Sequence, residues 1–285
     1  MTPVTPVTPA TPATPFGTRL HAAIADRGPF CVGVDPHAAL LRAWGLADDV
    51  AGLESFALTV VEAVAPYASV VKPQSAFFER FGSRGIAVLE RVIAQAREAG
   101  ALVLLDVKRG DIGSTSQAYA DAYLDPASPL AADAITVSPF LGFGSLDPMV
   151  ETARVHGAGL FVLALTSNKE GPEVQHARVD DVAGGGTVAG RMLDHLRRLN
   201  ADAVPLGSFG AVVGATIGST EEDLAFNGPV LAPGFGAQGG TLADVRRLFG
   251  SAAAVLPSSS REVLRLRRPE AMRDLVVRTN EELRS

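Results

Sequence analysis

The feature of the chain that most constrains its fold is a regular alternation of short apolar runs with longer amphipathic stretches. Residues 49–66 and 77–99 carry apolar side chains at three- and four-residue steps, which predicts helices. The runs between such stretches are continuously apolar, which is typical of parallel strands buried on both faces. Eight runs of this kind occur: Phe30–Asp35, Ser69–Gln74, Leu102–Lys108, Ala134–Pro139, Gly159–Thr166, Phe209–Thr216, Pro229–Phe235 and Ala252–Pro257.

Eight strands, each followed by a helical stretch, match a (β/α)₈ barrel, the TIM barrel, which takes about 250 residues. The alternative is a doubly wound α/β sheet, which usually has fewer strands and a glycine-rich turn after the first one. Here Asp35-Pro36-His37 follows the first run and contains no glycine. We therefore expect residues 16–285 to form a single α/β barrel domain that carries the catalytic site.

The first fifteen residues are rich in threonine and have a proline at every third position. Proline removes backbone donors and blocks helix formation, so we expect residues 1–15 to be a disordered, polyproline-like tail. This segment has neither the basic start nor the apolar centre of a signal peptide, which favours a cytoplasmic protein.

The charge balance and the apolar pattern exclude two classes of partner. Lys and Arg number 25 against 31 Asp and Glu, a net charge of −6, so no basic excess is available to bind nucleic acid. The uncharged stretch from Val204 to Thr220 is broken by Pro205 and four glycines, so no membrane span is expected. The single cysteine, Cys31, cannot form an internal disulfide, and its place within a run predicts a core residue.

About twenty residues, Ser167–Gly186, interrupt the alternation before the helix that we expect over Thr187–Leu199. Within them, Gly184-x-Gly186-x-x-Ala189 formally matches a dinucleotide-binding fingerprint. No strand precedes it and no βαβ unit surrounds it, so the match is weak. We expect an exposed loop that caps the following helix.

Charged residues stand at the ends of neighbouring runs, and functional side chains of a barrel gather at the carboxyl ends of its strands. Asp106 and Lys108 are two residues apart and face the same side, with Val107 facing the other. Lys72 on the adjacent strand and Asp111 further along are available as alternating partners. A structural ion-pair ring that closes the barrel is the alternative interpretation, but clustering at the catalytic end favours a functional site.

A second group of residues has the chemistry of a phosphate site. The loop Gly234–Gly240 offers backbone donors, Gln238 a side-chain donor, and Arg261 follows the eighth run. Barrels often bind phosphate with the loops after strands seven and eight. The glycine loop by itself equally fits a plain turn, and the arginine after the next strand makes the phosphate interpretation more specific.

No sequence feature calls for a metal or a bound cofactor. The five histidines show no metal-ligand spacing, and we expect most of them at the surface. No Walker A sequence is present, which disfavours hydrolysis of nucleoside triphosphates.

The segment LLDVKRGDIGST resembles the Asp-x-Lys-x-x-Asp signature of the orotidine 5′-phosphate decarboxylase family. VGVDP in the first run, VVKPQSAFFE in the second, LAPGFGAQGG in the seventh and the arginine after the eighth are similar to that family as well. The resemblance extends from about residue 16 to the end and is strongest to the longer bacterial form, type 2. Related sugar-phosphate enzymes share the signature alone, whereas its combination with Lys72, Gln238 and Arg261 is specific.

The resemblance implies decarboxylation of orotidine 5′-phosphate to uridine 5′-phosphate and CO2, the last step of pyrimidine nucleotide synthesis, with neither metal nor cofactor. It also implies that Lys72, Asp106, Lys108 and Asp111 form an alternating charge network in which Lys108 is the proton donor. Asp111 and Thr115 are implied to reach into the active site of a partner subunit, so that the active form is a homodimer.

The resemblance further implies contacts with the ribose, the pyrimidine and the phosphate, made respectively by Asp35 and Lys72, by Ser167, and by Gln238 with Arg261. Two departures affect these assignments. Ser260 stands where shorter members of the family have a glycine before the arginine. The long segment after the fifth run leaves Thr166 as an alternative to Ser167 for the contact with the base.

Two other functions compete with this interpretation. One is a Mg²⁺-dependent sugar-phosphate decarboxylase or aldolase on the same barrel, which needs an acidic ligand near the end of the second run, where this chain has Lys72. The other is a phosphate-binding protein without catalytic activity, which the presence of both lysines and both aspartates of the signature disfavours.

Overall fold

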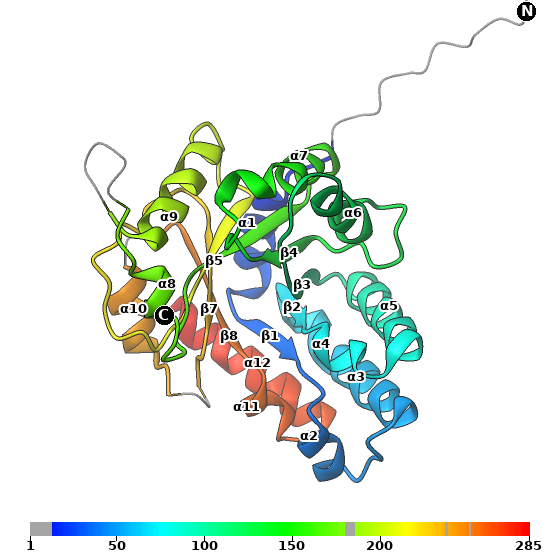
Figure 1. Ribbon diagram of the computed structural model, residues 1–285. Coiled ribbons are helices and arrows are strands. Elements are labelled where there is room, and N and C mark those ends of the chain that lie inside the picture. Colours follow the sequence, from blue (N-terminus) through cyan, green and yellow to red (C-terminus); the bar gives the residue numbers. More distant parts are fainter. Residues whose placement is uncertain (1–12, 180–185, 237–238, 251) are drawn as a thin grey trace, which may run out of the picture.

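The computed structural model describes residues 13–179, 186–236, 239–250 and 252–285, and it shows a closed barrel of eight parallel strands (Figure 1). Each strand neighbours the next one in the chain, and β8 pairs with β1 to close the barrel. The predicted fold is confirmed, and every predicted run contains a strand. Their bounds are β1 Cys31–Val34, β2 Val70–Pro73, β3 Leu102–Arg109, β4 Ala134–Val137, β5 Gly159–Leu165, β6 Phe209–Val213, β7 Pro229–Pro233 and β8 Ala254–Ser259.

Helices surround the strands on the outside of the barrel (Figure 1). The predicted helix over 77–99 is two helices, because the chain turns between them and Gly82 adopts a left-handed φ of 64°. The α-helices are α1 Phe16–Arg27, α2 Ala38–Ala43, α3 Val50–Val64, α4 Ala76–Glu79, α5 Gly82–Glu98, α6 Gly113–Leu124, α7 Asp147–His156, α8 Pro172–Gln175, α9 Val188–Leu199, α10 Leu242–Phe249, α11 Arg261–Leu264 and α12 Pro269–Arg284. Short 3₁₀ turns occupy Ala65–Tyr67 and Phe143–Leu146.

One strand lacks the helix that we expected after it. Residues 214–228, between β6 and β7, form turns and loop without any helix, so the expectation of a helix after every strand is wrong here. The segment has no apolar repeat at three- or four-residue steps, which an amphipathic helix needs to cover a sheet. Leu224 and Phe226 are nevertheless buried and anchor the loop to the core.

Side chains inside the barrel form an inner apolar layer. Cys31 is fully buried there, as predicted for a core residue. Phe16 and Leu20 of α1 belong to the same layer, and the Phe16 ring meets that of Phe161 edge to face with centroids 6.0 Å apart. The other buried members are Val70, Leu104, Ala134, Leu206, Val212, Leu231 and Leu256.

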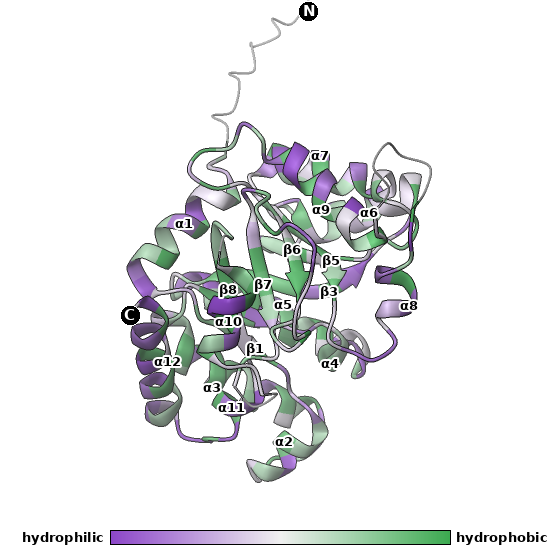
Figure 2. Cartoon of the chain, turned by 90° about the vertical axis from the view of Figure 1, so that its left-hand side faces the viewer, coloured by the Kyte–Doolittle hydropathy of each residue, from purple (hydrophilic) through white to green (hydrophobic). Residues whose placement is uncertain are grey.

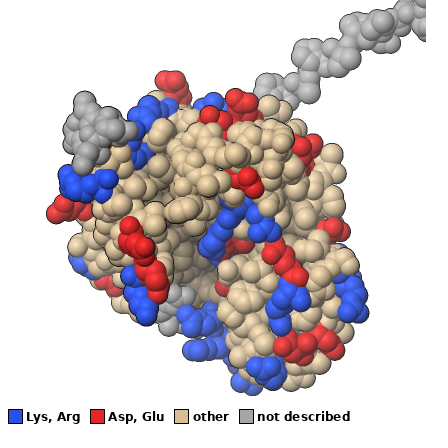
Figure 3. Space-filling view, in the orientation of Figure 1, with Lys and Arg blue, Asp and Glu red and all other residues tan. Residues whose placement is uncertain are grey.

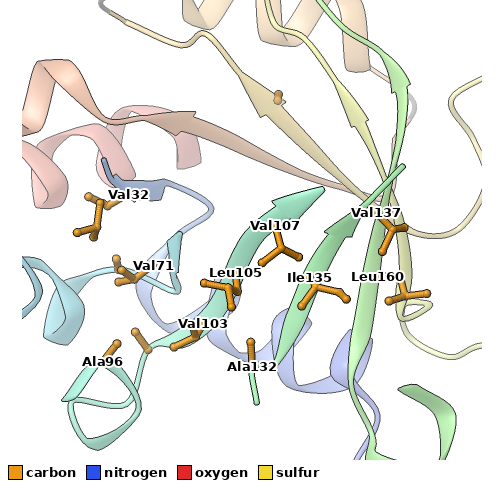
Figure 4. Packing of buried hydrophobic residues seen from close by; sticks show 14 of the residues in the cluster. Val32, Val71, Ala96, Val103, Leu105, Val107, Ala132, Ile135, Val137 and Leu160 are labelled. Atoms are coloured by element: carbon orange, nitrogen blue, oxygen red, sulfur yellow. The ribbon is translucent and has the colours of Figure 1, made fainter. Parts of the chain in front are cut away.

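Alternate residues of the strands form a second apolar layer beneath the helices. In β3, Val103, Leu105 and Val107 belong to this layer (Figure 4), which confirms that Val107 faces away from the barrel interior. The strands are predominantly apolar and lie at the centre, whereas the helices around them carry many hydrophilic residues (Figure 2). Near the end of β3, the residues that alternate with this outward layer are Asp106 and Lys108.

The segment after β5 is only partly an irregular loop. It contains the short helix α8, and a bridge pairs Arg178 with Thr187. Thr187 caps α9, because its hydroxyl accepts the Gly190 N–H at 2.9 Å, in agreement with the predicted capping. Gly184 and most of the Thr/Pro-rich tail lie outside the described residues.

One segment, Val50–Tyr67, meets the length and hydropathy of a membrane-spanning helix, although half of it is buried inside the protein. It consists of α3 and the turn that follows. Leu53, Phe56 and Val60 of α3 are fully buried in the apolar layer beneath the helices. A core helix of this kind satisfies the same criterion on composition alone.

Candidate active site

Asp106 is the centre of a charged cluster at the carboxyl end of the strands. Its carboxylate accepts hydrogen bonds from Lys72 Nζ at 3.2 Å and from Lys108 Nζ at 2.6 Å. Thr136 Oγ1 donates to the same carboxylate at 2.7 Å. The structure thus brings together Lys72, Asp106 and Lys108, which come from the neighbouring strands β2 and β3.

A bulge in β3 sets the position of Lys108. Between residues 105 and 109 of β3 the paired strand β4 advances only from 135 to 137, so β3 holds two extra residues there. Lys108 has a φ of 48°, a left-handed conformation that is uncommon for lysine. Its N–H donates to Thr136 Oγ1 at 3.0 Å, so one hydroxyl positions both the backbone of Lys108 and the carboxylate of Asp106.

Thr136 is a site residue that was not predicted from the sequence. Thr136 lies within an apolar run of β4, and its side chain is almost completely buried. A hydroxyl in such a run must find a hydrogen-bond partner inside the protein. That requirement was the available signal, but it does not say which partner the hydroxyl finds.

Burial and the two lysines have opposite effects on the ionisation of Asp106. Burial alone would raise the pKa of the carboxyl group, but the charges of Lys72 and Lys108 outweigh it and hold the pKa well below its usual range. Burial likewise opposes the charge of Lys72, yet Asp106 and Asp35 hold the pKa of its amine above the ordinary value. Both groups are therefore charged at neutral pH.

The lowered pKa of Asp106 also makes its pairing a contribution to stability. This contribution is fully present above the ordinary carboxyl pKa of about 4. It is lost in acid, as the pH falls through the lowered pKa of the folded state.

The charged cluster opens into a cavity of about 320 Å³. Leu163, Val212 and Leu231 of β5, β6 and β7 form an apolar part of its wall. The charges therefore occupy one side of a cavity and do not form a ring around the barrel, which disfavours the structural interpretation. The predicted site residues that line the cavity are Asp35, Lys72, Asp106, Lys108, Ser167 and Arg261.

Two buried polar atoms at this cavity have no hydrogen-bond partner among the described residues: Asp35 Oδ1 and Ser260 Oγ. Gly33 lies against both side chains, because a Cβ at Gly33 would be 2.7 Å from Ser260 Cβ and 3.3 Å from Asp35 Oδ2. Buried polar groups are normally hydrogen-bonded, so these two atoms are available to a ligand. Ser260 is a second residue that the sequence marks only as a departure from the family pattern.

The structure distinguishes Thr166 from Ser167, although both line the cavity. The Thr166 hydroxyl donates to Asn168 Oδ1 at 2.7 Å and accepts from Gln175 Nε2 at 2.6 Å. Ser167 is exposed, and its hydroxyl makes no hydrogen bond within the described part of the chain. Of the two hydroxyls, the one on Ser167 is therefore without a partner in the described part of the chain, and its contact with the base stays a prediction.

Asp111 and Thr115 lie apart from the cluster in this single chain, and neither lines the cavity. The Asp111 carboxylate accepts the N–H of Ile112 at 2.8 Å, and Thr115 is exposed on α6. The Ile112 side chain is 62% exposed, and Phe140, after the adjacent strand β4, is 75% exposed. Large apolar side chains are thus exposed around the predicted intersubunit residues.

The described glycines of the loop after β7 hydrogen-bond to one another. Gly236 N–H donates to Gly240 O at 2.8 Å, and Gly239 N–H donates to Gly236 O at 2.7 Å. Gly236 has a φ of 72°, and a Cβ there would collide with the Glu262 carboxylate. Gln238 lies outside the described residues, so its predicted contact with phosphate stays a prediction.

The described residues contain no group of three or more His, Cys, Asp or Glu side chains arranged to hold a metal ion.

The chain is similar to known proteins in both sequence and structure. A family model described as the orotidine 5′-phosphate decarboxylase / HUMPS family matches residues 28–272. A curated relative from Nocardioides sp. (strain ATCC BAA-499 / JS614), named orotidine 5′-phosphate decarboxylase, is 89% identical over 270 residues, which are 95% of this chain and 99% of the relative. A relative of the same name from Salinispora arenicola is 66% identical over 87% of this chain and 89% of its own length.

A crystal structure of a protein from Streptomyces avermitilis has 58% identity and a TM-score of 0.92, and the match covers 98% of each chain. The family match covers most of the chain, and both relatives carry the same name. The chain belongs to the orotidine 5′-phosphate decarboxylase family.

Proposed function

We propose that this enzyme converts orotidine 5′-phosphate into uridine 5′-phosphate and CO2, and that Lys108 stabilises the reacting carbon and then protonates it. The observation that carries the proposal is the placement of the Lys108 ammonium 2.6 Å from Asp106 at the wall of the cavity. Membership of the family supports orotidine 5′-phosphate as the substrate. The charged cluster supports electrostatic stabilisation and protonation of the reacting carbon.

The main requirement of the reaction is to stabilise the negative charge on the carbon from which CO2 leaves. When the C–C bond breaks, its electron pair stays on a ring carbon that has no adjacent electron sink, so stabilisation must be electrostatic. An ammonium about 4 Å away contributes about 4 kcal/mol at an effective dielectric constant of about 20. Lys108 Nζ then transfers a proton to that carbon, and its side chain, 47% exposed, recovers a proton from water.

Asp106 acts on both the lysine and the substrate in this proposal. Its carboxylate orients the Lys108 ammonium, and Lys72 and Thr136 keep the carboxylate ionised and fixed. The carboxylate of bound orotidine 5′-phosphate would face Asp106. Repulsion between the two like charges is relieved when CO2 leaves, so the interaction favours the transition state over the bound substrate.

Binding of the nucleotide uses the rest of the cavity. Asp35 Oδ1, buried and without a partner among the described residues, is suited to a ribose hydroxyl together with Lys72. Ser167 offers its hydroxyl to the pyrimidine. Arg261 and Gln238 hold the phosphate, and the unpartnered hydroxyl of Ser260 is placed to join them. Phosphate binding remote from the reacting carbon then orients the base.

The active form in this proposal is a homodimer with shared sites. Asp111 and Thr115 would complete the charge network of the partner subunit, and exposed Ile112 and Phe140 would be covered by the interface. Residues 16–285 form the catalytic barrel. We expect the enzyme to act in the cytoplasm on this small-molecule substrate, without metal or cofactor and without a nucleic-acid or membrane partner.

The direct test is the loss of ultraviolet absorbance as purified protein consumes orotidine 5′-phosphate, with uridine 5′-phosphate identified as the product. We expect turnover that is unchanged after treatment with a metal chelator. Absence of turnover would overturn the proposed activity, and loss of activity on chelation would favour the Mg²⁺-dependent alternative.

Lys108→Ala tests the role of the lysine. We expect kcat to fall at least about 1,000-fold, because both the stabilising charge and the proton are lost. Binding of uridine 5′-phosphate, measured by calorimetry, should persist. Lys169→Ala is the matched control, since the Lys169 side chain is 92% exposed and does not line the cavity, and its kcat should equal that of the wild type. Substantial activity in Lys108→Ala would contradict the proton-donor role.

A further inference from the structure

A second cavity adjoins the active site on the side of Arg261. It has a volume of about 890 Å³ and is lined by α2, by Phe77 and by the segment that follows β8. Asp35, Gln74, Ser260 and Arg261 line both cavities, so the two adjoin along these residues. A ligand held in the second cavity would therefore be next to the proposed phosphate contacts.

Arginines dominate the charge of this second cavity. Arg261, Arg265 and Arg267 line it, all three are exposed, and Asp35 is the one acidic residue among its described lining residues. None of the three arginines forms an ion pair with another residue in the described part of the chain. Figure 3 shows Lys and Arg side chains gathered over the lower part of this face, where Figure 1 places α11 and α2.

The local backbone arranges these arginines as a row that leads away from the active site. Arg265 N–H donates to Arg261 O at 3.1 Å, one helical turn on, so both side chains lie on the same face. Arg267 has a φ of 59°, a left-handed conformation that is uncommon for arginine, and it lies between α11 and α12. The result is a positive patch on a chain whose net charge is −6.

We propose that Arg265 and Arg267 form an outer anion subsite, which captures the phosphate group of a nucleoside monophosphate and passes it inward to Arg261. The inference rests on the proposed function, which makes the substrate a phosphate monoester. A negatively charged protein repels such a substrate, and a local group of arginines reverses that repulsion at the entrance. The subsite acts on encounter, so it raises the association rate and leaves the chemical step unchanged.

The test uses the double variant Arg265→Gln/Arg267→Asn, since asparagine tolerates the left-handed backbone at position 267. Trp44 is the single tryptophan and lines the second cavity, so its fluorescence reports binding of uridine 5′-phosphate in stopped flow. We expect the association rate constant to fall about 5-fold at low ionic strength, while kcat for orotidine 5′-phosphate stays unchanged. The difference should shrink from about 0.01 M to about 0.15 M salt, as the Debye length falls from about 30 Å to about 8 Å.

Arg198→Gln/Arg246→Gln is the matched control, because it removes the same two charges from exposed residues outside this cavity. Arg198 lies in the last turn of α9, and Arg246 lines a cavity with residues that precede β1 and β8, at the opposite end of the barrel. Equal rate losses in both double variants, or no loss in either, would overturn the subsite. Wild-type protein that binds the product through these arginines but does not turn over orotidine 5′-phosphate would refute the proposed function alone.

Discussion

The hydroxyl of Thr136 makes two hydrogen bonds: it donates to the Asp106 carboxylate and accepts from the backbone N–H of Lys108. Neither bond involves the substrate, so Thr136 is a positioning residue. The strained backbone of Lys108 needs this support, because a left-handed conformation is unfavourable for a side chain with a Cβ. The direction of the proposed proton donor therefore depends on a residue in the neighbouring strand.

Thr136→Val keeps the shape of the side chain and removes its hydroxyl. We expect kcat to fall on the order of 10-fold with little change in KM, because Asp106 and the Lys108 N–H each lose a partner, at a cost of about 1–3 kcal/mol for the unsatisfied group. Thr136→Ser retains the hydroxyl and should recover most of the activity. Equal kcat in Thr136→Val and wild type would show that the hydroxyl does not position the lysine.

Arg261→Ala separates phosphate binding from chemistry. We expect kcat/KM for orotidine 5′-phosphate to fall on the order of 100-fold, about 2.7 kcal/mol, because the charged partner of the phosphate is lost. The nucleoside orotidine has no phosphate, so its much slower decarboxylation should change little. Equal losses on the two substrates, measured under the same conditions, would remove the assignment of Arg261 to the phosphate.

At the scale of elements, one end of the barrel carries the cavity, and the opposite end carries an ion-pair cluster that stabilises the fold. Asp133, just before β4, is 8% exposed at the end opposite the cavity. Its carboxylate pairs with Arg19 of α1 and with Arg97 of α5 at 3.4 Å, and it accepts the Val103 N–H at 2.9 Å. One buried carboxylate thus joins two helices to two strands, far from the reacting groups.

Asp133→Asn is expected to lower the free energy of unfolding by about 2 kcal/mol, because the carboxylate is largely buried while the two arginines that lose it are 32% and 41% exposed. Residues at this end of a barrel contribute to stability, and the active site lies at the other end, so kcat of the folded enzyme should be unchanged. Urea denaturation and steady-state kinetics measure the two quantities. Asp26→Asn removes a pair whose acid is 74% exposed and should cost less than about 1 kcal/mol. A loss of kcat without loss of stability would contradict this division.

At the scale of the whole molecule, the single chain leaves the proposed charge network incomplete. Lys72, Asp106 and Lys108 meet within one chain, whereas Asp111 points its carboxylate at its own backbone neighbour. Exposed Ile112 and Phe140 lie beside the carboxyl ends of β3 and β4. An interface over these side chains would bury apolar surface and would bring the partner's copy of the α6 start toward the cavity.

Mixing two inactive variants tests whether the sites are shared. In a mixed dimer of Lys108→Ala and Asp111→Ala, one site carries both changes and the other carries neither. Random exchange makes half of the dimers mixed, so about one quarter of the wild-type activity should return, as expected for an isologous pair. Persistent inactivity after subunit exchange is verified by mass spectrometry would indicate a site built within one chain.

Local patterns in the sequence were sufficient to predict the barrel and part of its site. Each apolar run contains a strand, and the outward direction of Val107 was predicted from strand alternation, whereas the bulge that sets the position of Lys108 was not predicted. The break at Gly82 and the missing helix after β6 were not predicted, because a single left-handed glycine or an unpatterned loop gives little signal against a regular repeat.

The sequence by itself determined the alternation of strands and helices and the chemical types at the strand ends, because burial and side-chain direction repeat over a few neighbouring residues. Only the tertiary structure decided which of those side chains meet. Thr136 reaches Asp106 across thirty residues of chain, and Ser260 lies against Gly33, because barrel closure fixes the register between strands. Such contacts depend on how distant segments align in space, and no short stretch of sequence encodes that alignment.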